Sequence, residues 1–217
     1  MSTSDRYRTS EFLRALSDEQ LERIRPLLRE KRFERGKVLF FIDEPAEYLF
    51  GVEKGEVRLY RSSKDGRITT LERLLEGEVF GAISTLEGDR YPVSAEGVSD
   101  GVAWCLPRAQ FLRLLDEDPR LAREVLEIVT RRLHSAHERV RSFAHDPAPS
   151  RLAQALLRSC RDGEARVTRK DLAEAAGTTV ETAIRVFRSF QRDGIIQGSV
   201  GRITLLDEVA LVEIADR

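Results

Sequence analysis

The stretch of sequence that decides the fold is Thr168–Gln191, TRKDLAEAAGTTVETAIRVFRSFQ. Its apolar residues recur at the spacing of an α-helix, and Gly177 interrupts them where a turn can form. The pattern predicts two short helices that share one buried face, which is typical of a helix-turn-helix. The residues of that face are Leu172, Ala173, Ala176, Val180, Ala183, Val186, Phe187 and Phe190.

Both helices of this stretch carry a start signal of the form Thr-x-x-acid. Thr168 with Asp171 marks the first helix, and Thr178 with Glu181 marks the second. The second helix of a helix-turn-helix enters the major groove, so its solvent-facing side chains are candidates for DNA contact. For Glu181 a second interpretation stays open, in which it only closes the capping box. The candidates, with the turn that precedes the helix, are Thr178, Thr179, Glu181, Thr182, Ile184, Arg185 and Arg188.

This part of the chain resembles a known family. Gly177–Arg185, GTTVETAIR, together with Phe187–Ile196, is similar to the recognition helix of the Crp/Fnr family of bacterial transcription regulators. The resemblance implies that Glu181 and Arg185 read the G·C pair of each half-site. The chemistry agrees, because arginine can donate two hydrogen bonds to guanine and a carboxylate can accept one from cytosine N4.

Two neighbouring positions bear on which bases are read. Val180 resembles the Fnr-like branch of the family, which implies half-sites that begin TTGA rather than GTGA. That branch usually has a serine directly before the reading arginine, where this chain has Ile184. An exposed isoleucine can contact a thymine methyl group, or it can be tucked against the helix pair. The outer bases of the half-site therefore stay open.

The composition is that of a protein with an ordinary hydrophobic core. Of its 217 residues 41% are hydrophobic, and the formal net charge is -1. The chain is not a globally basic nucleic-acid binder, but a sequence-specific regulator needs only a local basic face. It shows no signal peptide and no apolar run long enough to span a membrane, so we expect a cytoplasmic protein. Cys105 and Cys160 lie far apart, which excludes a disulfide framework and a local zinc site.

We expect an α+β protein of three parts: a sensor domain over 1–117, a dimerisation helix over 118–145 and a winged helix-turn-helix domain over 146–217. Helix starts at Ser10–Leu16 and at Ser17 precede short alternating segments, which glycines separate and which predict a jelly-roll. The expected strands are Lys31–Phe41, Tyr48–Gly51, Glu56–Arg61, Ile68–Leu74, Val79–Phe80, Val93–Val98 and Val102–Leu106.

Parts of this barrel resemble the cyclic-nucleotide-binding β-roll, namely Phe33–Phe40, Gly55–Tyr60 and Gly77–Gly81. A jelly-roll enzyme of the cupin kind would need a metal site of histidines and carboxylates, and residues 28–107 contain no histidine. We therefore expect no enzyme. A β-roll module that controls a partner protein is a rival interpretation, and the DNA-reading helix argues against it.

A helical stretch follows Pro107, and its part over 120–143 carries two apolar stripes. Leu121, Val125 and Ile128 form one stripe, which is expected to rest on the barrel. The other alternates spacings of four and three, the heptad pattern of two helices packed along their length. It consists of Ala122, Leu126, Val129, Leu133, Ala136, Val140 and Phe143. We expect a parallel homodimer, as the resemblance also implies, with two recognition helices one helical turn apart on an inverted repeat.

The C-terminal part begins after a predicted hinge at Asp146–Pro149, because prolines do not continue a helix. A helix is expected over Arg151–Ser159, and Ile195–Leu206 predicts a β-hairpin wing. Arg169 and Arg202 are candidate phosphate contacts. For Arg202 a solvated charge without a contact is an equal alternative.

The β-roll is not expected to bind cyclic AMP. In cyclic-AMP-binding relatives, a Gly-Glu pair and an Arg-Ser pair hold the ribose and the phosphate, and a Thr-Ser pair on the dimer helix contacts the adenine. Here Ala82 supplies no carboxylate for the ribose, and Pro92 has no backbone N–H for the phosphate. The corresponding pairs are Gly81-Ala82, Tyr91-Pro92 (or Arg90-Tyr91 with the loop shifted by one residue) and Ala136-His137.

Other effectors leave alternatives open. No cysteine precedes Cys105, so an iron–sulfur cluster is not expected. His137 is the candidate ligand for haem, and sensing of nitric oxide or carbon monoxide through haem stays an alternative. An isolated histidine on an amphipathic helix is more often a polar surface residue, and regulation by abundance alone is a further alternative. The expected partners are duplex DNA, a second copy of the chain and, for an activator, RNA polymerase; no membrane contact is expected.

Overall fold

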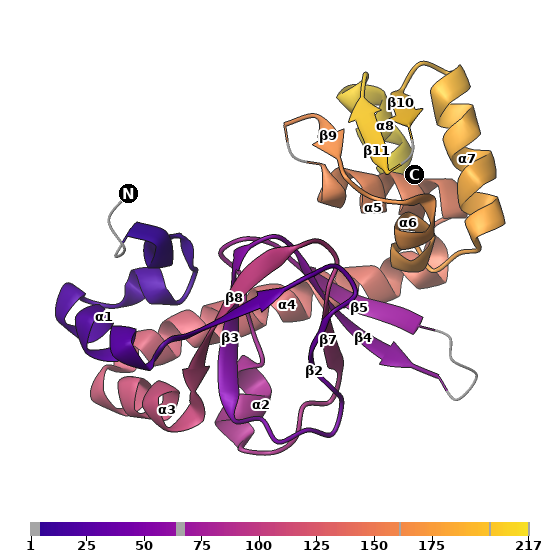
Figure 1. The fold of residues 1–217 in the computed structure, drawn as a ribbon. Helices are drawn as coiled ribbons and strands as arrows, with labels where there is room; N and C mark the ends of the chain where they lie inside the picture. The colour runs from indigo at the N-terminus through magenta and orange to yellow at the C-terminus, as the bar shows by residue number, and fades with distance from the viewer. Residues whose placement is uncertain (1–4, 64–67, 161, 200, 217) are drawn as a thin grey trace. The chain divides into compact units, whose positions relative to one another are not determined.

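The computed structural model describes residues 5–63, 68–160, 162–199 and 201–216 (Figure 1). The chain forms two compact units, Met1–Leu133 and His134–Arg217, and each is described by itself below. Among the described residues, no helix is long and apolar enough to cross a membrane.

The first unit contains two antiparallel four-stranded sheets, which confirm the predicted jelly-roll (Figure 1). One sheet has the order β1-β8-β3-β6 and the other has the order β2-β7-β4-β5. Gly51 and Trp104 pair across β3 and β8, and a Cβ on Gly51 would overlap the indole ring. A glycine there gives the buried tryptophan its space. The strands are β1 (Arg29–Phe33), β2 (Val38–Phe40), β3 (Tyr48–Lys54), β4 (Val57–Ser62), β5 (Ile68–Leu74), β6 (Val79–Phe80), β7 (Ser94–Gly97) and β8 (Gly101–Pro107).

The single strand expected over Lys31–Phe41 is wrong. It is two strands, β1 and β2, which belong to different sheets. Gly36 lies between them with a left-handed φ of 83°, and its N–H donates to Gly97 O. That backbone geometry suits glycine, so Gly36 ends one strand and redirects the chain into the other sheet.

The helical segments before and between the strands were predicted only in part. The helix expected at Ser10–Leu16 is wrong in type and length, because only a 3-10 turn, η2 (Leu13–Ala15), forms there. A further 3-10 turn, η1 (Asp5–Thr9), precedes it and was not predicted. The expected start at Ser17 is confirmed, because Ser17 caps α1 (Asp18–Ile24) through a capping box. A 3-10 turn, η3 (Arg25–Leu27), and a short helix, α2 (Ala82–Glu87), were not predicted.

The helical stretch after the barrel is α3 (Arg108–Glu117) followed by α4 (Pro119–His145). The stripe of Leu121, Val125 and Ile128 is buried, and it packs into one core with the N-terminal turns and β8. This confirms that one side of the long helix rests on the barrel. The division between the two units falls within α4, after Leu133.

The second unit combines helices with a small antiparallel sheet of order β10-β11-β9. The hairpin of β10 and β11 confirms the predicted wing, while Val200 lies outside the described residues. The first helix begins three residues earlier than predicted: Pro147 is its N-cap, and Pro149 lies in the first turn, where no backbone N–H is needed. The elements are α5 (Ala148–Ser159), β9 (Glu164–Ala165), α6 (Arg169–Ala175), α7 (Val180–Arg192), β10 (Ile196–Ser199), β11 (Arg202–Leu205) and α8 (Glu208–Ala215).

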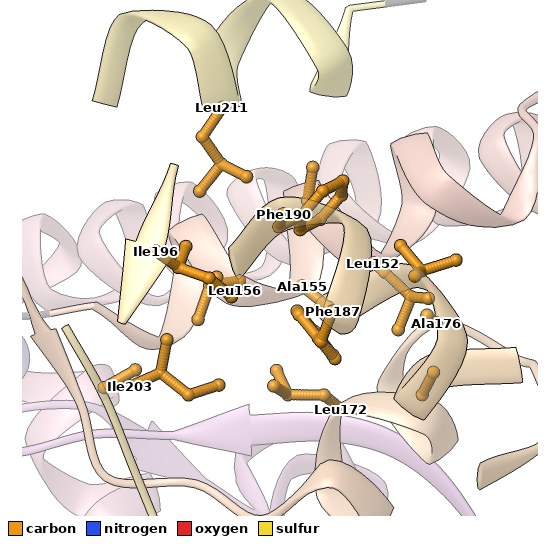
Figure 2. Close-up of a cluster of buried hydrophobic side chains, with 14 of the residues drawn as sticks. Leu152, Ala155, Leu156, Leu172, Ala176, Phe187, Phe190, Ile196, Ile203 and Leu211 are labelled. Atoms are coloured by element: carbon orange, nitrogen blue, oxygen red, sulfur yellow. The ribbon is translucent and has the colours of Figure 1, made fainter. Parts of the chain in front are cut away.

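Figure 2 shows the hydrophobic core that holds α6 and α7 in place. Phe187 and Phe190 of α7 pack edge to face with ring centroids 5.8 Å apart, and Leu172 of α6 joins the same cluster. Leu211 adds α8, a helix that was not predicted. The expected burial of Val180 is wrong, because this first residue of α7 is 41% exposed.

Candidate DNA interface

The first helix of the predicted pair, α6, begins at the expected cap. Thr168 Oγ1 accepts a hydrogen bond from the Asp171 N–H at 3.1 Å, and the Asp171 carboxylate accepts one from the Thr168 N–H at 2.9 Å. This reciprocal pair satisfies backbone N–H groups that the first helical turn leaves without partners. It also fixes Arg169 as the first residue of α6.

Gly177 ends α6 through a Schellman turn. Its N–H donates to Glu174 O at 3.2 Å, and the N–H of Thr178 donates to Ala173 O at 2.9 Å. The turn requires a left-handed residue, and Gly177 has a φ of 57°. Thr178 is therefore part of the turn between the two helices.

The second helix, α7, begins one residue later than predicted. Thr179 is its N-cap, and Thr179 Oγ1 accepts a hydrogen bond from the Thr182 N–H at 3.1 Å. The predicted capping box of Thr178 with Glu181 is wrong. Glu181 takes no part in the cap, and within the described residues no ion pair holds its carboxylate.

One face of α7 presents the predicted reading residues to solvent. Glu181, Arg185 and Arg188 are exposed and succeed one another at helical spacing. Ile184 is 37% exposed, so it lies on this face rather than inside the helix pair. Ser189 and Arg192, which the sequence interpretation omitted, continue the same face. A shared concavity is lined by Glu181, Thr182, Ile184, Arg185, Arg188, Ser189 and Arg192.

The spacing of the chain contains the signal for the two omitted residues. Ser189 lies four residues after Arg185, and Arg192 lies four residues after Arg188. Arg192 donates to Ser189 Oγ at 3.1 Å and pairs with the neighbouring Asp193 at 3.2 Å. The positive face therefore extends to the last turn of α7.

The two candidate phosphate contacts differ in their surroundings. The guanidinium of Arg169 lies over the Phe187 ring, 4.8 Å from its centroid, and a Cβ on Gly198 would come within 2.6 Å of its Nη2. Burial there lowers the pKa of Arg169 from its ordinary value. Arg202 of the wing is exposed and forms a 3.8 Å ion pair with Glu164. Arg169 is thus held between α7 and the wing, whereas Arg202 is a surface cation.

The predicted dimer seam leaves large apolar side chains in contact with solvent. Leu126, Leu133, Val140 and Phe143 are 64%, 52%, 67% and 49% exposed. Val129 is half-buried and packs partly against the core of the first unit. The exposed members recur along a single helix, which is the distribution of an apolar stripe that the described residues of the protomer leave uncovered.

Three of the predicted effector-pocket residues, Gly81, Ala82 and Tyr91, lie together in the first unit. Gly81 has a left-handed φ of 79°, and Ala82 is buried. The Tyr91 ring stacks on Phe40 at 3.8 Å, and its hydroxyl donates to Tyr48 O at 2.7 Å. Burial raises the pKa of Tyr91 to about 12. The interior beside Gly81 is therefore occupied by aromatic side chains.

The other predicted pocket residues are Arg90 of the first unit and two residues of α4 in the second unit. Arg90 is exposed and donates to Asp43 O. Ala136 and His137 belong to the second unit, where Ala136 is half-buried and His137 is exposed. Across the described residues, no three His, Cys, Asp or Glu side chains gather into a group able to hold a metal ion.

Comparison with known proteins bears on both units. Residues 30–118 match the family model of the cyclic nucleotide-binding domain, and residues 150–214 match the Crp-like helix-turn-helix domain. The chain is 31% identical over 196 residues to the global nitrogen regulator of Synechococcus elongatus, covering 85% of this chain and 88% of that protein. It is 29% identical over 209 residues to the cyclic AMP receptor protein of Thermus thermophilus, covering 95% and 97%. The structure of FixK2 from Bradyrhizobium japonicum superposes with a TM-score of 0.80 at 25% identity, covering 86% of this chain and 96% of that one.

Proposed function

The chain belongs to the Crp/Fnr family of transcription regulators, which are DNA-binding proteins and not enzymes, and we propose that it acts as a homodimer on an inverted repeat with TTGA-like half-sites. We further propose that this activity does not depend on cyclic AMP. The protein would work in the cytoplasm, where the DNA lies, and it would contact RNA polymerase if it activates transcription. Its working parts are the proposed sensor domain, 1–117, the dimerisation helix, 118–145, and the DNA-binding domain, 146–217.

The observation that carries the proposal is the exposed pair of Glu181 and Arg185 on α7. Both side chains point away from the core, and among the described residues neither has an ion-pair partner. Their roles would be complementary: the carboxylate accepts from cytosine N4, and the guanidinium donates to O6 and N7 of the paired guanine. Thr179, Thr182 and Arg188 would reach the flanking backbone or base edges, with Arg169, Thr178 and Arg202 as further phosphate contacts.

The exposed seam on α4 supports the homodimer. Leu126, Leu133, Val140 and Phe143 repeat at heptad spacing, and a second copy of the same helix would remove all four from water. The proposed interface includes the half-buried Val129 and Ala136 as well. A twofold dimer presents two copies of α7 to the DNA, which is why an inverted repeat is the expected operator.

Two features of the β-roll support independence from cyclic AMP. Ala82 provides a methyl group where the ribose of a cyclic nucleotide would need an acceptor. The Tyr91 ring packs inward onto Phe40. Its backbone N–H donates to Glu44 O and its carbonyl accepts from the Asp43 N–H, so this N–H is already used and is not available to a phosphate. We expect that cyclic AMP changes neither the melting temperature of the protein nor its affinity for DNA.

The proposal is tested by selection from a random duplex pool with reduced, effector-free protein. Enrichment of an inverted repeat with TTGA-like arms would support the proposed operator sequence and the homodimer, and it would also indicate that the protein binds DNA without an effector. Enrichment of single, unpaired half-sites would overturn the homodimer, and no enrichment would overturn DNA reading by the unliganded protein. In that last case the selection is repeated with haem, for which His137 is the candidate ligand, and with nitric oxide, which would bind to the haem.

A further inference from the structure

Phe143, the last residue of the seam, touches the turn of the helix-turn-helix. Its ring faces Gly177 so closely that a Cβ on this glycine would lie 2.8 Å from Cε1 and 3.2 Å from Cδ1. Almost half of the Phe143 side chain, 49%, is nevertheless exposed. One part of the ring thus supports the turn while another part remains available to a second protein surface.

A nearby arginine, Arg151, contacts both the Phe143 ring and the end of α6. The guanidinium of Arg151 lies 6.0 Å from the centroid of the Phe143 ring, within range of a cation–π interaction. Its Nε donates to Ala176 O at 2.8 Å, and its Nη1 donates to Asp146 O at 2.6 Å. Ala176 is the C-cap of α6, so Arg151 satisfies a carbonyl that the end of the helix leaves without an intrahelical partner.

The polar contacts continue into the end of α4 and the body of α5. The Asp146 carboxylate accepts from Gln154 Nε2 at 3.0 Å and pairs with Arg141 at 3.2 Å. Ser142 Oγ donates to Gln154 Oε1 at 3.0 Å. These bonds hold the last turn of α4 against α5 and limit how far Phe143 can move away from Gly177.

The contact also limits how the recognition helix can move. Gly177 has a left-handed φ of 57°, and only Thr178 and Thr179 separate it from the first residue of α7. A displacement of the Phe143 ring toward Gly177 meets backbone rather than a flexible side chain. The turn, and with it the start of α7, must then shift.

We propose that Phe143 is a positioning residue that transmits the packing of the dimer seam to the recognition helix, with Arg151 holding the turn against it. The inference rests on the proposed function, because it requires a second copy at the seam and DNA reading by α7. In that dimer the partner covers the exposed part of the ring and presses the other part against Gly177. A signal that alters seam packing at Phe143 therefore alters the placement of Glu181 and Arg185.

The first test is a double-mutant cycle between Gly177 and Phe143. Gly194 is the matched control: it follows α7 in the same left-handed conformation, with a φ of 73° and no atom within 4 Å of an added Cβ. G194A therefore introduces backbone strain alone, whereas G177A adds a collision with the ring. We expect G177A to weaken operator binding about fivefold more than G194A, which is the size of coupling found between residues in contact. When both glycine variants are also made in the F143A background, this excess should disappear. Equal losses in both glycine variants, or an excess that persists with F143A, would overturn the contact.

The second test separates positioning from folding and dimerisation. F143A is compared with V140A, another exposed seam truncation, at protein concentrations where both are dimeric by sedimentation. We expect F143A to lower the ratio of operator affinity to nonspecific DNA affinity about tenfold, since displaced helices lose base contacts but keep charge. V140A should keep the wild-type ratio, and F143L should restore most of it. Proportional losses on both DNAs would assign Phe143 a merely structural role.

The two hypotheses fail in distinguishable ways. If the wild-type protein prefers no operator over nonspecific DNA, the proposed function itself fails. If the wild type prefers an inverted repeat and the F143A ratio is unchanged, DNA reading stands and the transmission through Phe143 is wrong.

Discussion

The exposed seam on α4 leads to a quantitative prediction for Leu133→Ala. Leu133 lies near the middle of the heptad stripe and is 52% exposed in the protomer. Its exposed half faces solvent in the protomer. Truncation should therefore change protomer stability little and dimer stability much more.

The magnitude follows from the area still available for burial. Full burial of a leucine side chain contributes about 1.5–3 kcal/mol, so the exposed half is worth about 0.8–1.5 kcal/mol per protomer. Two symmetric copies double this contribution, and alanine keeps a part of it. We expect a loss of about 1–2 kcal/mol per dimer, which raises the dimer dissociation constant roughly five- to thirtyfold.

Sedimentation velocity over a protein dilution series measures that constant directly. Glu127→Ala is the matched control, because Glu127 is exposed on the same helix but lies outside the stripe. The control should dimerise as the wild type does, and both variants should retain their thermal unfolding midpoints within a few degrees. A dissociation constant for Leu133→Ala equal to that of Glu127→Ala would refute the seam.

Three further predictions concern the folded protomer. Hydrogen bonds from Arg120 lower the pKa of Asp118, so its carboxylate stabilises the fold above about pH 4, the unfolded pKa, and this contribution declines as the pH falls further. The difference in urea midpoint between wild type and Asp118→Asn should accordingly shrink between pH 7 and pH 3, and a constant difference would refute the assignment. Burial raises the pKa of Tyr91 to about 12, so the protonated hydroxyl stabilises the fold fully below pH 10, and this contribution is lost as the pH rises from 10 to 12. Tyr91→Phe, which also removes the hydrogen bond to Tyr48, should therefore reduce the fall in unfolding free energy between pH 10 and pH 12. An unchanged fall would contradict this assignment. Thr168→Ala removes a helix cap and should cost about 0.5–2 kcal/mol in urea unfolding, recovered in part by serine but not by valine.

The helix-turn-helix could be predicted from sequence because several local signals agree there. The capping pattern at Thr168, the glycine at Gly177 and the apolar period of α7 each have a physical cause within a few residues. The start of α7 could not be placed by the same signals, since Thr178 and Thr179 both look like caps. The Schellman turn decides between them: it uses the N–H of Thr178, so the cap passes to Thr179.

Other errors arose where long-range packing overrides the local pattern. The single strand expected over Lys31–Phe41 ignored the turn at Gly36, although the glycine itself was visible. The helix α8 was missed because its sequence, EVALVEIA, is apolar on nearly every side and shows no clear amphipathic period. The ring of Phe143 against Gly177 joins residues far apart in the chain, and no spacing rule anticipates it.

The most direct measurement of the central claim is a binding cycle between Arg185 and the guanine of the half-site. Wild-type protein and Arg185→Ala are each titrated onto an inverted repeat with TTGA arms and onto the same repeat with TTAA arms. The wild type should lose about 1–3 kcal/mol per altered contact when the G·C pair is replaced, and Arg185→Ala should lose most of this discrimination and keep only the part that Glu181 contributes through cytosine N4. An Arg185→Ala variant that still distinguishes guanine from adenine as strongly as the wild type would contradict the account.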